Sequence, residues 1–204
     1  MRQKYVQPAL VLIAIIALAG CGSSPKETYY TLSSTVAMNG SAPADGKPAY
    51  SVAVGPITLP EVVDRPQIVL RVGPNEVTYV ELHRWAGPLR NEIPRIIADN
   101  LAGYLNIRQV AAYPQSAGDN ADYRVLVDIQ RFDSTLGESV IIDALWSIKR
   151  QSDGAARTGR STAKESSSGG TYEAVVAGHS RALATVSREI AEAIRSMTAT
   201  TSSR

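Results

Sequence analysis

The stretch from Asp122 to Lys149 reads DYRVLVDIQRFDSTLGESVIIDALWSIK. Apolar and polar side chains alternate through residues 122–132 and again through residues 139–149. Alternation is the period of a β-strand that is buried on one face. The side chains that share these faces are Tyr123, Val125, Val127 and Ile129 in the first segment, and Val140, Ile142, Ala144, Trp146 and Ile148 in the second. The stretch therefore predicts two long strands, each with one apolar face.

Two other segments have a helical period, with apolar residues at steps of three and four. The first follows Trp85, and its apolar residues are Leu89, Ile93, Ile96, Ile97, Leu101, Tyr104 and Leu105. The second begins at His179 and carries Leu183, Val186, Ile190, Ile194 and Met197. Pro88 suits a first helical turn. Pro94 cannot donate to the carbonyl of Arg90, so we expect a loosened first turn or a later helix start.

Shorter strands are predicted around these elements from strand-forming residues and turn signals. They lie at Tyr29–Leu32, at Tyr50–Val54 ending before Gly55-Pro56, at 68–72, at 76–82, at 108–113 and, as a polar edge strand, at 155–164. The order is strands, helix, strands, helix. It predicts an α+β fold in which two amphipathic helices cover a mixed, largely antiparallel sheet.

Cys21 is the only cysteine of the 204 residues. It follows Arg2, Lys4, an apolar run of about a dozen residues and Leu18-Ala19-Gly20, which are the parts of a secretory signal peptide. The run is shorter than the roughly 20 residues of a membrane-spanning helix. Leu-Ala-Gly-Cys resembles the lipobox of bacterial lipoproteins, in which the thiol receives a diacylglycerol and the chain is cut before the cysteine. An uncleaved N-terminal anchor and a buried structural cysteine are the alternatives.

These features predict four parts of the chain. Residues 1–20 are the signal peptide, residues 21–27 are the lipidated cysteine and a flexible tether, residues 28–197 are a single globular domain, and residues 198–204 are a disordered tail. The whole chain has 21 Lys and Arg against 19 Asp and Glu. Loss of the leader removes Arg2 and Lys4 but no acid, so the mature chain is balanced. This balance argues against nucleic acid as a partner.

Catalytic motifs are lacking in the sequence. The two histidines, His83 and His179, have no metal-ligand spacing, and no Gly-x-Ser-x-Gly motif occurs. Residues 154–161, GAARTGRS, resemble a phosphate-binding loop but have Arg160 in place of the lysine and a Ser/Gly-rich stretch instead of a following helix. We therefore expect no enzyme activity, no metal and no cofactor.

The segment Leu59–Val69 is the best candidate for partner contact, because two prolines lower its ordering cost and Arg65 offers a planar fork to carbonyls or carboxylates. Asp64, Arg65, Gln67 and Trp85 are the predicted contact residues. Two structural alternatives remain. Asp64 and Arg65 could form an internal arrangement that shapes the loop, and Trp85 could belong to the core.

Several motifs in order resemble the PqiC/YmbA family of ABC-type transport auxiliary lipoproteins. They are the lipobox, Tyr29–Leu32, Val52–Pro56 with Leu59-Pro60, Asp64–Val69, and Arg84–Ala86 with Pro88-Leu89. Gly87 departs from the Glu of many members. The family fold is a three-layer α/β/α arrangement similar to anticodon-binding and TolB N-terminal domains.

The resemblance implies an accessory subunit that works with an MCE-domain (PqiB-like) protein and an inner-membrane permease in moving phospholipid or another hydrophobic molecule between membranes. Gly22 in place of Asp after the lipidated cysteine implies transfer to the outer membrane, with the body on its periplasmic face. A homo-oligomeric ring is geometrically compatible with a symmetric MCE assembly. The alternative function is a lipid-binding module that itself carries the hydrophobic ligand.

Mass spectrometry of the protein from native membranes is expected to show a lipidated N-terminus at Cys21, and an unprocessed Met1 would contradict this.

Replacement of Gly22 by Asp is expected to shift the protein toward the inner membrane on fractionation. Unchanged partitioning would remove the sorting argument.

Overall fold

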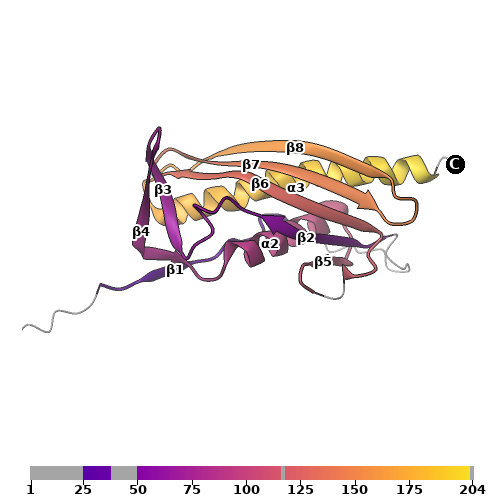
Figure 1. Ribbon diagram of the computed structural model, residues 1–204, viewed down its shortest axis with the longest axis horizontal. Helices are drawn as coiled ribbons and strands as arrows, with labels where there is room; N and C mark the ends of the chain where they lie inside the picture. The colour runs from indigo at the N-terminus through magenta and orange to yellow at the C-terminus, as the bar shows by residue number, and fades with distance from the viewer. Residues whose placement is uncertain (1–24, 38–49, 116–117, 203–204) are drawn as a thin grey trace, which may run out of the picture.

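The computed structural model describes residues 25–37, 50–115 and 118–202 (Figure 1). The signal peptide and the lipidation site at Cys21 lie outside the described residues. The strands and helices, in chain order, are β1 Thr28–Tyr30, β2 Val52–Thr58, β3 Gln67–Gly73, β4 Glu76–Trp85, α2 Leu89–Leu105, β5 Val110–Ala112, β6 Tyr123–Thr135, β7 Ser139–Arg150, β8 Ala156–Ser166 and α3 Tyr172–Ser202.

A five-stranded sheet in the order β5-β2-β6-β7-β8 forms the body of the protein. Its longest ladders are antiparallel and join β6 to β7 and β7 to β8, whereas β2 pairs in parallel with both β5 and β6. The two alternating segments of the sequence are thus confirmed as adjacent strands. Val127 lies opposite Trp146, and both side chains are on the buried face.

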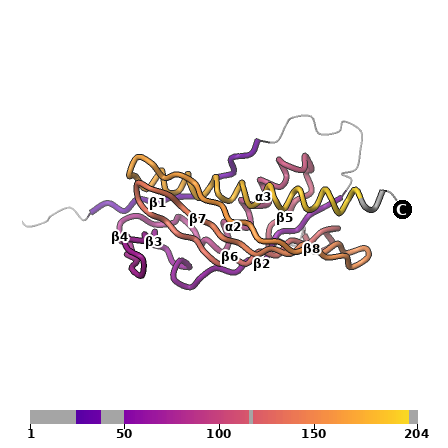
Figure 2. Tube along the Cα trace, turned by 90° about the horizontal axis from the view of Figure 1, so that it is seen from above, coloured from indigo at the N-terminus to yellow at the C-terminus, as the bar shows by residue number. Residues whose placement is uncertain are grey.

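Both helices pack against this buried face and against each other. Helix α3 crosses β7 and β8 and runs along the length of the molecule, and α2 covers β2 and β5 (Figure 1, Figure 2). The core between the sheet and the two helices is mainly aliphatic, with a few buried aromatic side chains. Ile93 and Ile97 of α2, Ile142 of β7 and Ile190 of α3 have no exposed surface. On the other face no helix of the described chain covers the sheet, and Leu126 and Leu145 there remain 42% and 41% exposed.

A second sheet of three strands, in the order β1-β4-β3, lies at one end of the molecule (Figure 1, Figure 2). β1 is parallel to β4, and β3 and β4 form an antiparallel hairpin. The predicted fold class, α+β with two main helices and mixed pairing, is confirmed and is consistent with a three-layer α/β arrangement. The single sheet that was expected is nevertheless divided in two.

Several predicted boundaries are wrong, each for a local reason. β2 continues through Gly55-Pro56, because a shift of register between Val54 and Ile57 accommodates the pair. α2 begins at Leu89, directly after Pro88, so of the two expectations for Pro94 the later helix start is wrong; burial of Leu89 and Ile93 holds the first turn.

Helix α3 is longer than predicted at both ends. It begins at Tyr172, because Val175 and Val176 extend the buried stripe upstream of His179. It also continues through residues 198–202, which were expected in the disordered tail. The core of the domain therefore reaches beyond the predicted helix toward the small sheet.

Gly159 on β8 lies opposite Trp146 on β7, and a Cβ at this position would overlap the six-membered ring of that tryptophan. We predict that Gly159→Ala lowers the free energy of unfolding by about 1–3 kcal/mol through overpacking. Urea unfolding measures this. Thr158→Ala, on the opposite face of the same strand, is the control and should change stability by less than about 0.5 kcal/mol. A Gly159→Ala protein as stable as the wild type would contradict the packing described.

Candidate functional site

A cavity of about 360 Å³ opens where the small sheet meets the start of α2. Its lining comes from two segments that are far apart in the sequence, Asp64–Pro66 and Trp85–Pro88. The backbone joins these segments directly, since the N–H of Trp85 donates to the carbonyl of Pro66 at 2.7 Å. The structure thus brings together three of the four predicted contact residues, Asp64, Arg65 and Trp85.

The loop before β3 is ordered by its own hydrogen bonds. The N–H of Val63 donates to Pro60 at 3.1 Å, and the N–H of Asp64 donates to Glu61 at 3.3 Å. The side chain of Val63 is only 6% exposed and fixes the loop to the core. A partner that binds here would therefore meet a surface that is largely formed in advance, which lowers the entropic cost of association.

Asp64 forms an ion pair with Arg90 in the first turn of α2. The Nε of Arg90 donates to Oδ1 of Asp64 at 3.2 Å, and a terminal nitrogen bonds the other oxygen. The internal role suggested by the sequence is therefore correct for Asp64, but its partner is Arg90 and not the adjacent Arg65. Because Arg90 is more than half exposed, the pair contributes little to stability; it connects the loop to the helix.

Arg65 lines the cavity, and its guanidinium lies over the ring of Tyr79. Its Nε donates to the carbonyl of Val62 at 2.9 Å, and its guanidinium carbon is 3.9 Å from the ring centroid of Tyr79. Stacking on the tyrosine orients the planar donor fork. Gln67 is not part of the cavity lining, because it belongs to β3, where its amide donates to Glu81 of β4 at 3.2 Å.

Trp85 belongs to the core and forms the inner wall of the cavity. It is 5% exposed and makes edge-to-face contacts with Phe132 and His179, with ring centroids 6.1 and 6.3 Å apart. Of the two roles that the sequence left open for Trp85, the structural one dominates. This tryptophan connects the small sheet to β6 and α3.

His179 is fully buried and is not placed for acid–base chemistry. Its ring stacks on Phe132 at 3.8 Å, and its Nε2 bonds the hydroxyl of Ser134 at 2.7 Å. Burial lowers the pKa of His179 to about 3, and the negative charge of Asp133 opposes this shift only in part. His83 lies in an aromatic stack with Tyr172, with its Nδ1 2.8 Å from the hydroxyl of Tyr30. Within residues 25–37, 50–115 and 118–202, no group of three His, Cys, Asp or Glu side chains could hold a metal.

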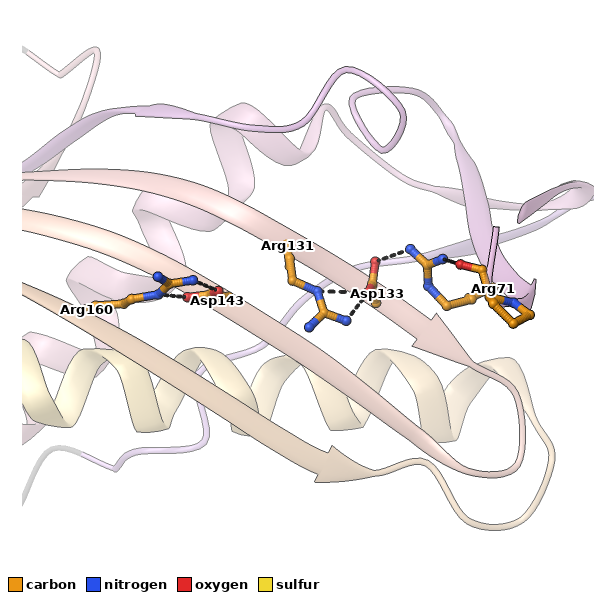
Figure 3. A network of polar contacts seen from close by, with 6 residues as sticks. Arg71, Arg131, Asp133, Asp143 and Arg160 are labelled. Atoms are coloured by element: carbon orange, nitrogen blue, oxygen red, sulfur yellow. Dashed lines mark hydrogen bonds and ion pairs between the residues drawn. The ribbon is translucent and has the colours of Figure 1, made fainter. Parts of the chain in front are cut away.

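The uncovered face of the five-stranded sheet is a second candidate surface, which carries an apolar hollow and ion pairs. It has an open hollow of about 640 Å³ around Pro56, Leu126 and Leu145. Figure 3 shows two groups of ion pairs, with Arg160 donating to Asp143 and both Arg131 and Arg71 donating to Asp133. The hydrogen bond from Arg160 is the main reason that the pKa of Asp143 lies below its ordinary value. Only the Arg131–Asp133 pair joins residues that are close in the sequence; Arg160 reaches Asp143 from the neighbouring strand, and Arg71 reaches Asp133 from the small sheet.

The sequence matches the profile of the ABC-type transport auxiliary lipoprotein component family over residues 30–191. The chain therefore belongs to this family of transport auxiliary lipoproteins, which is not a family of enzymes. Membership implies association with an ABC transporter and a membrane-anchored place in the cell envelope. Among the described residues, no helix is long and apolar enough to cross a membrane.

Solved structures support the fold. An uncharacterized protein aligns with a TM-score of 0.67 at 19% identity, covering 83% of this chain and 99% of its own. A protein from Xanthomonas campestris, described as a member of the DUF330 family, aligns with a TM-score of 0.63 at 23% identity over 87% of this chain and 99% of its own. No curated protein matches the sequence. These likenesses establish the architecture and do not assign a partner.

The buried, neutral His179 predicts a loss of stability in mild acid. The unfolded state takes up a proton below about pH 6.5, whereas the native state does so only near its lowered pKa of about 3. The free energy of unfolding should therefore fall as the pH falls from about 6.5 to 5, with a slope approaching about 1.4 kcal/mol per pH unit. Urea unfolding at several pH values measures the slope, and His179→Gln should flatten it. An equal slope in both proteins would show that His179 does not control this transition.

Proposed function

We propose that this protein is an accessory subunit of an MCE/ABC-type intermembrane lipid transport system. In this proposal Cys21 carries the lipid anchor, the outer membrane holds the anchor, and the body on the periplasmic side docks the transport conduit through the cavity at Arg65. The observation that supports the proposal most strongly is the family membership together with a preformed cavity at the predicted contact segment.

The cavity offers a partner a defined set of groups. Arg65 presents a planar cation whose orientation is set by Tyr79 and Val62. Asp64, which is held by Arg90, lines one rim, and Ala86 and Gly87 line the other. A loop of the conduit protein with an exposed carboxylate or with main-chain carbonyls fits such a surface. Gln67, which lies next to this rim on β3, would contact the same partner.

A lipid anchor gives this docking its strength. Tethering keeps the body in a thin layer beside the membrane, so that its effective concentration toward a conduit ending there is high even when the contact itself is small. An MCE-domain protein and an inner-membrane permease would be the partners. A ring of several copies is compatible with a conduit of matching symmetry.

The alternative function, in which the domain itself carries a phospholipid, has less support. The apolar stripes of both helices are used against the sheet, where Ile96, Leu101, Leu183 and Ile194 have no exposed surface. The cavity beside Trp85 is at the small end of the range of ligand pockets. Native mass spectrometry of the lipid-anchored protein would reveal a second, non-covalent phospholipid if this alternative held.

A charge reversal at Arg65 tests the docking surface. We predict that Arg65→Glu in the full chain weakens co-purification of the MCE-domain partner by at least about tenfold, which corresponds to about 1.4 kcal/mol. Quantitative pull-down from detergent-solubilised membranes measures the effect. Trp85 is unsuitable for this test, because its truncation would disturb the core.

Arg188→Glu on the exposed side of α3 is the matched control, since it makes the same change of charge on a different surface. It should leave the partner bound. Both variants should have wild-type thermal unfolding. Normal pull-down by Arg65→Glu would remove this cavity from the proposal, and an equal loss with Arg188→Glu would indicate a non-specific effect of charge.

A further inference from the structure

The exposed hydrophobic side chains of the described chain gather at one end of the molecule. Nine large hydrophobic residues are exposed, and five of them belong to the three-stranded sheet or to the loop that leads into it. These five are Tyr29, Val62, Val72, Tyr79 and Leu82. A sixth, Leu136, lies in the turn between β6 and β7, at the same end (Figure 1). Single exposed hydrophobics need no explanation, but a group at one pole of a molecule does.

The first strand of the globular domain, β1, lies at the same end (Figure 1). β1 begins at Thr28, seven residues after Cys21, and a chain of that length reaches at most about 25 Å. Any surface close to β1 must therefore stay within a few nanometres of the lipid that Cys21 would bear. The end of α3, by contrast, lies at the opposite pole (Figure 1, Figure 2).

The attachment of β1 to the body is rigid. Tyr30 is 8% exposed, and its hydroxyl bonds both His83 and Glu173. Glu27, just before β1, forms an ion pair with Arg84 of β4 at 3.3 Å. Because Glu27 and Tyr30 are fixed to the small sheet, the anchor keeps this end of the body, and not the end of α3, close to the membrane.

The chemistry of this end fits a lipid surface. Tyr29 and Tyr79 each carry an apolar ring and a polar tip, the combination that suits the boundary between headgroups and acyl chains. Arg84 lies opposite Tyr29 in the strand register, and its guanidinium is paired with Glu27 and Glu81. Acidic Glu27 and Glu81 balance it, so the contact would depend on apolar area more than on anionic lipid.

We propose that the three-stranded sheet rests on the membrane that holds the anchor, with Tyr29, Tyr79 and Leu82 at the level of the headgroups and α3 pointing away from the bilayer. This inference rests on the lipid anchor of the proposed function. The cavity at Arg65 then lies close to the membrane surface, so that a docked conduit would end beside the lipid rather than at a distance from it.

Fluorescence quenching by brominated lipid tests the orientation. The full lipid-anchored protein carrying Leu82→Trp is reconstituted in vesicles of phosphatidylethanolamine and phosphatidylglycerol with brominated acyl chains. The two native tryptophans, Trp85 and Trp146, are 5% and 8% exposed and provide a constant background. The added tryptophan should lose roughly half of its emission, as expected for a side chain at the headgroup–acyl boundary.

Tyr113→Trp is the matched control. Tyr113 is 55% exposed but follows β5, away from the small sheet (Figure 1). Its emission should be unchanged by brominated lipid. Equal quenching at both positions, or none at Leu82→Trp in a protein that floats with the vesicles, would overturn the proposed orientation. If the emission of Leu82→Trp changes only after addition of the MCE-domain partner, the exposed residues of the small sheet contact that partner. This result would also overturn the proposed orientation.

The two proposals can fail separately. A protein that does not float with vesicles lacks the anchor, and this result would contradict the proposed function before the orientation is measured. A protein that floats, binds its partner and shows no quenching contradicts only the inference about the small sheet.

Discussion

The fold depends on the one-sided burial of the five-stranded sheet. The apolar face of the sheet is covered by α2 and α3, and the side chains at this contact are mainly aliphatic, with Tyr123, Phe132 and Trp146 among them. Neither helix could bury its stripe alone, and neither long strand could hide its apolar face without them. The described chain contains no cysteine, so the burial of apolar surface has to hold the domain without a disulfide. The opposite face of the sheet is not covered by a helix of the described chain and carries an open apolar hollow and ion pairs.

The small sheet is attached to this body through Trp85. Its indole contacts Phe132 on β6 and His179 on α3, and its backbone N–H bonds Pro66. One residue thus connects the end of β4, the loop before β3 and the main core. The cavity at Arg65 lies at this junction, since it is lined by the segment Asp64–Pro66 and by the segment that begins with Trp85.

The charged groups of the described residues serve mainly to connect elements. Asp64 pairs with Arg90, Asp143 with Arg160, and Asp133 with two arginines. Both histidines are held in aromatic stacks, and the burial that lowers the pKa of His179 keeps it neutral at physiological pH.

The sequence by itself determined the strands and helices whose apolar residues recur at a regular spacing. The alternation at residues 122–132 and 139–149, the helical stripe from Leu89 and the resemblance to the auxiliary lipoproteins could all be read from neighbouring residues. The sequence also indicated the segment around Arg65 as the candidate for partner contact, and that role stays a prediction. Only the tertiary structure decided that the strands form two sheets, that Asp64 bonds Arg90 instead of Arg65, and that Trp85 is a wall of the cavity. These features join residues that are distant along the chain, and their pairing depends on strand register and helix packing, which local patterns of side chains do not specify.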